Sequence, residues 1–310
     1  MDNLNKGYVS VSGGHELYYE VYGNPDGIPI LFLHGGPGAG FFEMDKRFFD
    51  PKIHKVIFFD QRGASRSKPF GSIVNNETDL LIDDITHLLK VLGVEKVVLF
   101  AGSWGCTLAL VYAIKFPFRI MGMILRGVFL GNKKAIDHYI NGGVEMYYPE
   151  EWERFVKDIP TANRENIAKF YLQKMKSNSS TSERFAYQWA HYEISIFKKG
   201  ISSKEVENII ELYPYQSLAI LEAHYLSNNC FIEENYILNN IHFIKNIPVS
   251  IIQGRHDVIC PPIFAYQLHQ KLNKSNLLIV EAAHSDSEPE IEKNLISELQ
   301  ILVGNLIPFN

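Results

Sequence analysis

The feature that most constrains the fold of this 310-residue chain is a set of short, continuous apolar runs separated by segments of helical periodicity. The runs are IPILFLHG (28–35), KVIFFD (55–60), KVVLFAG (96–102) and MGMILRG (121–127). Such runs are typical of β-strands that are covered on both faces. ETDLLIDDITHLLKVLG (77–93) and TLALVYAIKF (107–116) predict helices between them. The alternation therefore predicts an α/β fold with a mostly parallel central sheet.

The pattern changes in the middle of the chain. Residues 133–245 show helical periodicity, many aromatic residues and few strand-like runs. Strand-like runs return afterwards at IPVSIIQG (247–254) and NLLIVEAAH (276–284). We therefore expect one α/β core domain, formed by residues 1–132 and 246–310, with a helical cap domain at 133–245 inserted into it.

Composition disfavours several classes of function. The chain has 30 Lys and Arg against 35 Asp and Glu, and no basic block interleaves with aromatic residues, so we expect no nucleic-acid partner. No apolar run approaches the roughly 20 residues that span a bilayer, and the first residues lack the apolar part of a secretion signal. Cys106, Cys230 and Cys260 are widely spaced and form no C-x-x-C pair, which favours a reducing compartment. We expect a cytoplasmic protein that does not bind membranes.

Ser103 stands at a candidate nucleophile elbow. In AGSWGC (101–106) it follows a predicted strand and precedes a predicted helix, as in the G-x-S-x-G turn of serine hydrolases. Such a turn exposes the serine hydroxyl and leaves the amides at the start of the helix free to stabilise an oxyanion. Because Ala101 replaces the first glycine, an ordinary turn serine stays open as the alternative.

A serine nucleophile needs a histidine base that is held by a carboxylate. Asp257 and His284 each follow or end a predicted strand, so both are expected at the same edge of the sheet as Ser103. The order Ser, Asp, His along the chain is that of α/β-hydrolases. His256 and Asp286 are neighbouring alternatives, and a turn or capping role stays open for Asp257 and His284 taken singly.

HGGPG (34–38), directly after the first buried run, is a candidate oxyanion-binding loop. Glycines let backbone N–H groups approach a ligand closely, and we expect one donor from Gly35 or Gly36 and another from Trp104. The alternative is a plain Gly-Pro turn, and His34 is expected to anchor the loop. The chain has neither a phosphate-loop motif nor the ligand spacing of a zinc site, so we expect no metal and no nucleotide cofactor.

Six segments together resemble the proline iminopeptidases, which are prolyl aminopeptidases of the α/β-hydrolase fold. The segments are HGGPG (34–38), DQRGASRS (60–67), AGSWGCTLALVYA (101–113), ILRGVFL (124–130), QGRHDVICPP (253–262) and AAHSDSEP (282–289). The resemblance covers nearly the whole chain, and HGGPG, DQRG and GSWG in this order are specific to the family.

The resemblance implies Ser103 as the nucleophile, Asp257 as the orienting carboxylate and His284 as the general base. It also implies that two cap glutamates, Glu193 and Glu222, hold the free amine of a peptide substrate. A free N-terminal amine is largely cationic near pH 7, so two carboxylates suit it. Without the resemblance, both would be interpreted as solvated helix glutamates.

The resemblance further implies an apolar pocket for the proline ring at Phe129, Tyr139 and Cys260, for which core packing is the alternative. The chain departs from the family pattern at Ala101 and Ser65, where glycine is usual, at Tyr192, where tryptophan is usual, and at Leu226, where phenylalanine is usual. We expect these departures to affect the rim of the substrate pocket, which leaves the strictness for proline open.

Asp60 and Arg62 of DQRG are expected to form a structural ion pair. The whole sequence predicts a metal-free serine exopeptidase that releases N-terminal proline from small peptides with a free N-terminus, through a Ser-His-Asp triad and an acyl-enzyme. One alternative is an aminopeptidase, amidase or esterase of the same fold with a broader preference. Another is a non-catalytic binding protein with this fold. The sequence leaves the oligomeric state open.

Overall fold

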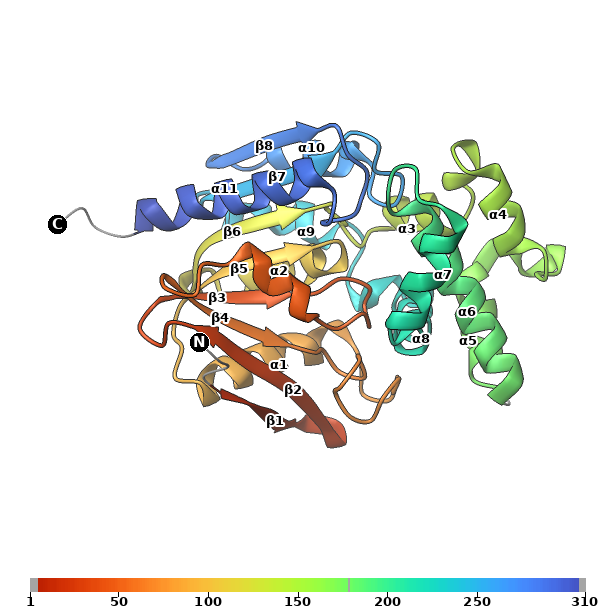
Figure 1. Cartoon of the computed structure of the whole chain (residues 1–310), viewed down its shortest axis with the longest axis horizontal. Coiled ribbons are helices and arrows are strands. Elements are labelled where there is room, and N and C mark those ends of the chain that lie inside the picture. Colours follow the sequence, from red (N-terminus) through yellow and green to blue (C-terminus); the bar gives the residue numbers. More distant parts are fainter. Residues whose placement is uncertain (1–4, 178, 307–310) are drawn as a thin grey trace.

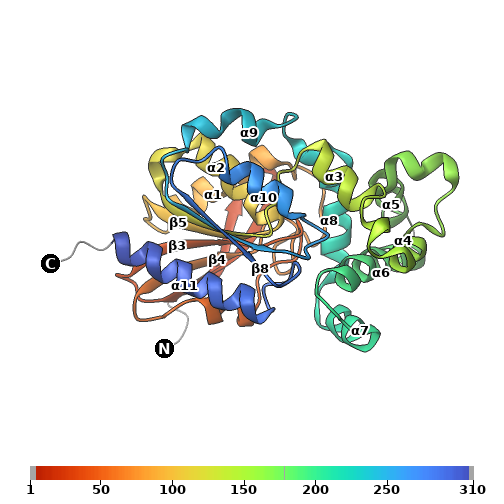
Figure 2. The same ribbon diagram turned by 90° about the horizontal axis from the view of Figure 1, so that it is seen from above.

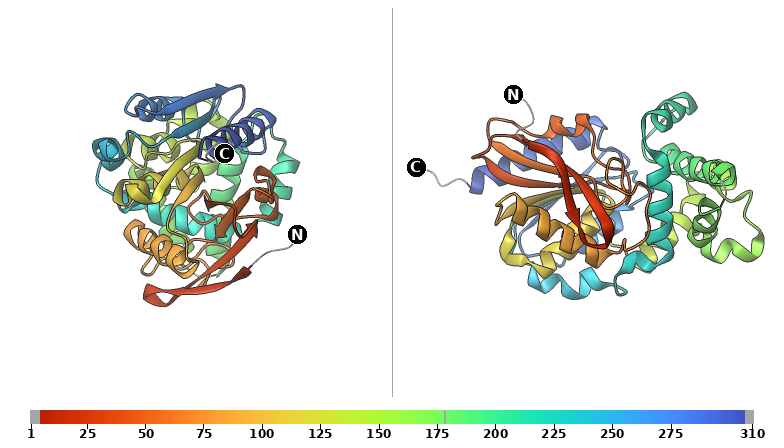
Figure 3. Two further views of the ribbon diagram at one scale, coloured as in Figure 1. Left: turned by 90° about the vertical axis from the view of Figure 1, so that its left-hand side faces the viewer. Right: turned by 90° about the horizontal axis from the view of Figure 1, so that it is seen from below.

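The computed structural model describes residues 5–177 and 179–306. Its strands form one eight-stranded sheet in the order β1-β2-β4-β3-β5-β6-β7-β8. Their bounds are β1 (Asn5–Val11), β2 (His15–Gly23), β3 (Ile28–Leu33), β4 (His54–Phe59), β5 (Val97–Gly102), β6 (Ile120–Arg126), β7 (Val249–Gly254) and β8 (Ser275–Val280). All neighbours from β4 to β8 run parallel, and only the pairs β1–β2 and β2–β4 are antiparallel. Figure 3 shows the β1–β2 pair along one edge of the sheet. The expected mostly parallel sheet is confirmed.

Helices cover both faces of the sheet and its carboxyl edge. Their bounds are α1 (Thr78–Val91), α2 (Trp104–Lys115), α3 (Lys133–Ile140), α4 (Pro149–Val156), α5 (Ile167–Met175), α6 (Ser179–Ile196), α7 (Ser203–Leu212), α8 (Tyr215–Ser227), α9 (Tyr236–Asn240), α10 (Pro262–His269) and α11 (Pro289–Leu306). Helices α1, α2 and α10 lie on one face and α11 on the other (Figure 2). Helices α4 to α8 lie beyond the carboxyl ends of the parallel strands (Figure 1), whereas α9 returns to pack on α2. No helix in the described part of the chain has the length and apolar content to cross a membrane.

The covered faces explain why the strand sequences are continuously apolar. In β3, Leu31 and Leu33 belong to the core on the α2 side, and Ile30 and Phe32 belong to the core beneath α11. Alternate side chains point to opposite faces of a strand, so both sets have to be apolar when both faces are packed. Burial of each such side chain contributes about 1.5–3 kcal/mol relative to exposure.

The many aromatic residues of the cap pack against one another and are continuous with the core on the α2 side of the sheet. Phe155 from α4 stacks on Tyr192 from α6 with ring centroids 4.1 Å apart, and on Tyr171 from α5 at 4.8 Å. The Tyr192 hydroxyl donates to the Tyr139 carbonyl at 2.8 Å and so ties α6 to α3. Tyr192 and Leu226 are therefore buried packing residues, and neither lines the cavity beside Ser103, contrary to their expected place at a pocket rim.

The expected ion pair between Asp60 and Arg62 is wrong, because the two side chains bind groups on different elements. Asp60 pairs with Arg66, whose Nε lies 2.7 Å from Oδ2. Arg62 makes a bidentate pair with Asp84 on α1, with Nε to Oδ2 at 2.5 Å and Nη2 to Oδ1 at 2.7 Å. Each arginine binds its carboxylate through two nitrogens. Bidentate contact of this kind is stronger than a single hydrogen bond.

Two element boundaries differ from the sequence expectation near the candidate site. Helix α2 begins at Trp104 rather than at residue 107, because Ser103 itself is the residue that precedes the first helical turn. Strand β8 ends at Val280, so residues 281–284 form a loop rather than the end of a strand. Both differences place the candidate residues on turns at the edge of the sheet.

The turn between β5 and α2 requires glycine at position 105. A Cβ on Gly105 would lie 2.1 Å from the Leu33 carbonyl oxygen, whereas a Cβ on Gly304 in α11 would meet nothing within 4 Å. We expect Gly105→Ala to lower the free energy of unfolding by about 1–3 kcal/mol through overpacking. Gly304→Ala, the matched control in another helix, is expected to be neutral or to stabilise by up to about 1 kcal/mol. Urea unfolding measures both, and equal stability of the two variants would contradict the close approach.

Candidate active site

Ser103 occupies a strained turn between β5 and α2. Its φ of 58° and ψ of −126° lie in a region that side chains other than glycine rarely adopt. The turn is held by the backbone, because the Ser103 amide donates to the Arg126 carbonyl at 2.9 Å and the Cys106 amide donates to the Ser103 carbonyl at 2.9 Å. Strain of this kind persists only where the surroundings enforce it, and it concentrates at functional sites.

Ala101 fits this turn without displacing it. It pairs in register with Leu33 of β3 and Leu125 of β6, and it is 1% exposed within the apolar core. Its methyl group therefore takes an ordinary core position. Of the two small residues that flank Ser103 in the sequence pattern, only Gly105 faces a backbone too close for a side chain.

Asp257 and His284 are hydrogen-bonded, with His284 Nδ1 2.8 Å from Asp257 Oδ2. The other carboxylate oxygen accepts from the amides of Ile259 at 3.0 Å and Cys260 at 2.8 Å. Gln253 Nε2 adds a donor to Oδ2 at 3.1 Å. These bonds fix the carboxylate in one orientation, so it can orient the imidazole in turn.

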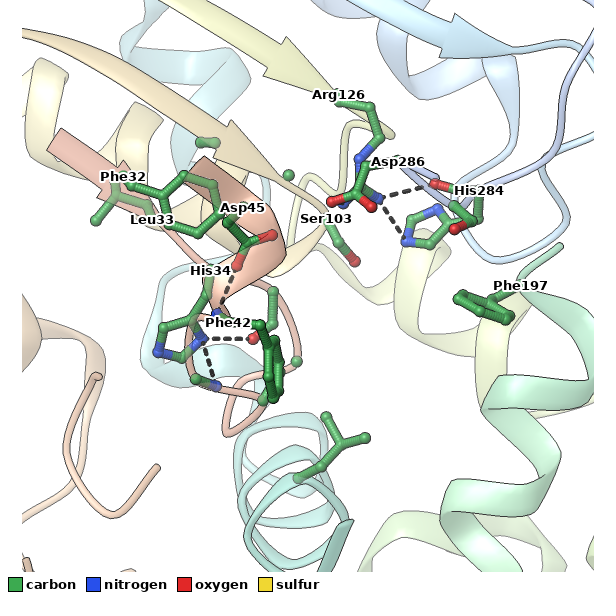
Figure 4. A pocket seen from close by; sticks show the side chains of 18 of the residues that line it. Phe32, Leu33, His34, Phe42, Asp45, Ser103, Arg126, Phe197, His284 and Asp286 are labelled. Atoms are coloured by element: carbon green, nitrogen blue, oxygen red, sulfur yellow. Dashed lines mark hydrogen bonds and ion pairs between the residues drawn. The ribbon is translucent and has the colours of Figure 1, made fainter. Parts of the chain in front are cut away.

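Arg126, at the end of β6, contacts the opposite side of the His284 ring. Its Nη1 lies 3.2 Å from His284 Nε2 and donates to the His284 carbonyl at 2.9 Å (Figure 4). An ionised carboxylate only accepts and a guanidinium only donates. His284 therefore carries its hydrogen on Nδ1, toward Asp257, and presents the lone pair of Nε2, which is the tautomer a general base requires.

Ser103 and His284 line one cavity, but no hydrogen bond joins them among the residues that the structure covers. The Ser103 hydroxyl lies near the buried Cys260 thiol, whose pKa it lowers against the larger effect of burial. Arg126 stands beside the nitrogen to which the serine would donate its proton. In enzymes without substrate, catalytic hydrogen bonds are often unformed and tighten only on binding.

The cap holds the loop that carries His284. The amides of His284 and Ser285 both donate to the Phe197 carbonyl, at 3.0 and 2.9 Å. Phe197 directly follows α6, the helix that carries Glu193. One cap helix thus positions both the histidine loop and a candidate substrate ligand. This contact could not be predicted from the sequence, because it is made by a backbone carbonyl.

The HGGPG loop places free amides beside Ser103. The amides of Gly35 and Gly36 form no hydrogen bond within the described ranges, and Trp104, as the first residue of α2, has no acceptor in its helix. His34 anchors the loop by accepting from the Gln61 amide at 3.0 Å, and burial lowers the pKa of this imidazole. Gln61 also accepts from the Trp104 indole at 2.9 Å, so it connects the HGGPG loop to the start of α2.

Glu193 and Glu222 are near enough in the cap to affect each other's pKa. Burial raises the pKa of both carboxyls, and the charge of Glu193 raises that of Glu222 further, so the pair holds a proton to higher pH than free carboxyls do. The Trp189 indole donates to Glu222 at 2.6 Å. Glu193 Oε2 is buried without a close donor among the described residues, although the Tyr139 phenol is near enough to lower the Glu193 pKa slightly against the effect of burial.

The three residues expected around the proline ring are all buried, and none lines the cavity beside Ser103. Cys260 is beside Ser103, and Tyr139 is close enough to Glu193 and Glu222 for their charges to raise the pKa of its phenol, which burial raises most. Phe129 accepts through its carbonyl from the Thr107 hydroxyl at 2.7 Å. The structure thus brings Tyr139 and Cys260 to the site and gives Phe129 a backbone contact with α2.

The cavity beside Ser103 has a volume of about 160 Å³ and is lined by both core and cap residues. Its lining includes Gly35, Gly36, Ser103, Glu193 and His284. In residues 5–177 and 179–306, no group of three or more His, Cys, Asp or Glu side chains is placed to hold a metal ion.

Comparison with known proteins first defines the class. A family model described as alpha/beta hydrolase fold matches residues 28–290. An alpha/beta hydrolase enzyme from a deep-sea metagenome library superimposes with a TM-score of 0.71 at 16% identity, over 98% of this chain and 99% of that one. A proline iminopeptidase-related protein from Thermus thermophilus gives 0.64 at 19%, over 99% and 100%. The chain belongs to the α/β-hydrolase fold family.

More similar relatives define the group within that family. The proline iminopeptidase of Arabidopsis thaliana is 36% identical over 98% of this chain and 82% of its own length. The proline iminopeptidase of Neisseria meningitidis serogroup B is 35% identical over 98% of both chains. The chain belongs to the proline iminopeptidases, as its motifs predicted.

The raised pKa of Glu222 predicts a pH-dependent cost to stability. Below the unfolded pKa near 4.5, Glu222 is protonated in both states and costs nothing. As pH rises, the unfolded chain loses the proton first, so the stability of the folded protein falls until the folded pKa is passed. Glu222→Gln removes this cost, so its advantage over the wild type should grow from pH 4 to pH 8.

Urea unfolding across this pH range measures the difference. Glu207→Gln is the matched control, because Glu207 is an exposed glutamate of another cap helix. Its difference from the wild type should be small and independent of pH. A difference for Glu222→Gln that is equally flat would show that the carboxyl is not held in its protonated form.

Proposed function

We propose that this protein is a serine aminopeptidase that releases proline from the N-terminus of peptides. The observation that carries the proposal is a pair of buried carboxyls, Glu193, which lines the cavity of Ser103 and His284, and Glu222, which interacts with Glu193. Such a pair is costly unless a cation compensates it. A peptide amine is such a cation near pH 7, and its binding lets the pair release the retained proton.

In the proposed reaction, the Ser103 hydroxyl attacks the first carbonyl carbon of the peptide while His284 Nε2 takes its proton. Arg126 has to yield its position beside Nε2 for this step. Asp257, held by its three further donors, stabilises the imidazolium that forms.

The oxyanion of the tetrahedral intermediate would accept from Trp104 and from Gly35 or Gly36, whose amides are free for this purpose. His284 then returns its proton to the leaving amine as the carbon–nitrogen bond breaks. Water attacks the remaining prolyl ester, again with His284 as the base, and releases free proline.

We also propose that the substrates are small peptides with a free N-terminus and that the protein acts in the cytoplasm. A blocked N-terminus has no positive charge for the buried carboxyls and leaves them uncompensated. The free and buried thiols of Cys106, Cys230 and Cys260 are compatible with a reducing compartment.

The amine requirement is tested with prolyl, alanyl and leucyl arylamides, each with a free and with an acetylated amine. We expect the free prolyl arylamide to have the highest kcat/KM. Glu193→Gln and Glu222→Gln should each lower it by about 10- to 100-fold, the value of a charge-assisted hydrogen bond. Glu207→Gln is the control and should match the wild type. Preferential cleavage of the acetylated or the non-prolyl arylamides would favour the broader amidase or esterase instead.

The nucleophile is tested with a serine-directed aryl phosphonate. We expect stoichiometric labelling that Ser103→Ala abolishes, because the phosphonate forms its bond with an activated serine. Ser285→Ala is the matched control, since Ser285 is a buried serine that lines the same cavity. Mass spectrometry reads the label. Folded wild-type protein that takes up no label would favour the non-catalytic binding protein.

A further inference from the structure

The cavity beside Ser103 extends past the serine to an end that the proposed reaction does not yet use. We call it the distal end, and it is lined by Phe42, Met44, Asp45, Tyr213 and Asp286. In Figure 4, Asp45 and Phe42 lie on the opposite side of Ser103 from His284 and Phe197. Glu193 lines the cavity near the Phe197 end of α6.

The direction of the substrate follows from these positions, given the proposed function. The substrate amine lies at Glu193, and the first carbonyl carbon lies at the Ser103 hydroxyl. The backbone nitrogen of the next residue, which leaves with the second product, has to lie beside His284 to receive its proton. A long side chain of that residue extends past Ser103 toward the distal end. There it meets the groups that line that end.

The arginines near the distal end already form hydrogen bonds and ion pairs with other residues of the protein. Arg126 donates to the His284 carbonyl, and its Nη2 lies 3.7 Å from Asp286 Oδ2. Arg47 contacts Asp286 Oδ1 at 3.2 Å and Glu292 at 2.9 Å. The two arginines thus flank both oxygens of Asp286.

Asp45 is the acidic group that these arginines compensate least. The residue is 7% exposed, and its Oδ2 accepts from the Phe42 amide at 2.7 Å. Among the described residues, the cationic group nearest to Asp45 Oδ1 is Arg47 Nη1, at 4.0 Å. Burial and the charge of Asp286 raise the pKa of Asp45 to about 7. A second cation beside this carboxylate would be bound favourably, because it offsets both effects.

The walls of the distal end fit a long, cationic side chain. The rings of Phe42 and Tyr213 have centroids 4.2 Å apart, and Met44 is half exposed next to them. Apolar and aromatic surfaces of this kind pack against the methylene stem of arginine or lysine while the charged head reaches a carboxylate.

We propose that the distal end selects a cationic residue after the scissile bond and that Asp45 is the residue that determines this specificity. The preferred substrate class is peptides that begin Pro-Arg or Pro-Lys. The proposal rests on the proposed function, because the direction of the peptide follows from the amine site.

The test compares Pro-Arg-amide with Pro-citrulline-amide, which has nearly the same shape without the charge. The amidated terminus removes a carboxylate that could bind the arginines. At pH 8, where Asp45 is mostly ionised, we expect kcat/KM to be about tenfold higher for the arginine peptide. Pro-Glu-amide should be cleaved more slowly than either. Equal rates for arginine and citrulline would overturn the proposal.

Two variants locate the preference. Asp45→Asn should reduce the ratio of arginine to citrulline turnover to near one, because the amide still accepts from the Phe42 backbone but carries no charge. Glu43→Gln is the matched control, since the Glu43 side chain is 85% exposed two residues away and does not line the cavity. It should retain the wild-type ratio, and a full preference in Asp45→Asn would show that another group selects the cation.

The pH dependence of the same ratio tests Asp45 in the wild-type protein, without reliance on the folding of a variant. The ratio should rise between pH 6 and pH 8 as Asp45 ionises, and titrations shared by the two peptides cancel. The other groups that face Asp45 are Asp286, Arg47, Arg126 and Tyr213. The arginines stay charged in this range, and burial and the two carboxylates raise the pKa of Tyr213 to about 12.

The outcomes separate this proposal from the function on which it rests. If neither peptide nor any prolyl arylamide is cleaved, the aminopeptidase function fails. If prolyl arylamides and both peptides are cleaved with a ratio of one at every pH, the function stands and the selectivity of the distal end is wrong.

Discussion

The close approach of the β5–α2 turn to the end of β3 is the constraint on which the candidate site depends. Gly105 leaves no room between the helix start and the Leu33 carbonyl, so the serine turn and the HGGPG loop are forced together. A Cβ on Gly35 would lie only 3.3 Å from the Ser103 Cβ. The candidate nucleophile and the candidate oxyanion donors are thus placed by backbone packing, before any side chain contributes.

The cap completes this arrangement instead of only covering it. Helix α6 supplies Glu193, and the carbonyl of Phe197 at its end accepts from the amides of His284 and Ser285. The candidate amine ligand and the candidate base are therefore linked through one helix. The aromatic core around Phe155 keeps that helix in place against its neighbours.

Much of the fold could be predicted from the sequence, because strands covered on both faces leave an unbroken apolar pattern. The residues at the strand ends, Ser103, Asp257 and His284, were predicted for the same reason, and their catalytic roles remain a prediction. Contacts made by long side chains or by backbone carbonyls, in contrast, leave no local pattern in the amino-acid sequence and could not be predicted.

The position of Arg126 beside His284 is one such contact. Asp60 and Arg62 show the same difficulty: Asp60 pairs with Arg66 in the same loop, whereas Arg62 pairs with Asp84 on α1.

The anchoring of the histidine loop by the Phe197 carbonyl bears on the size of substrate that the protein can hydrolyse. Whenever α6 moves away to admit a large chain, the loop of His284 loses its two bonds to the Phe197 carbonyl. Under the proposed function, hydrolysis then requires the cap to stay closed over a short peptide, so folded proteins whose first residue is proline would not be substrates.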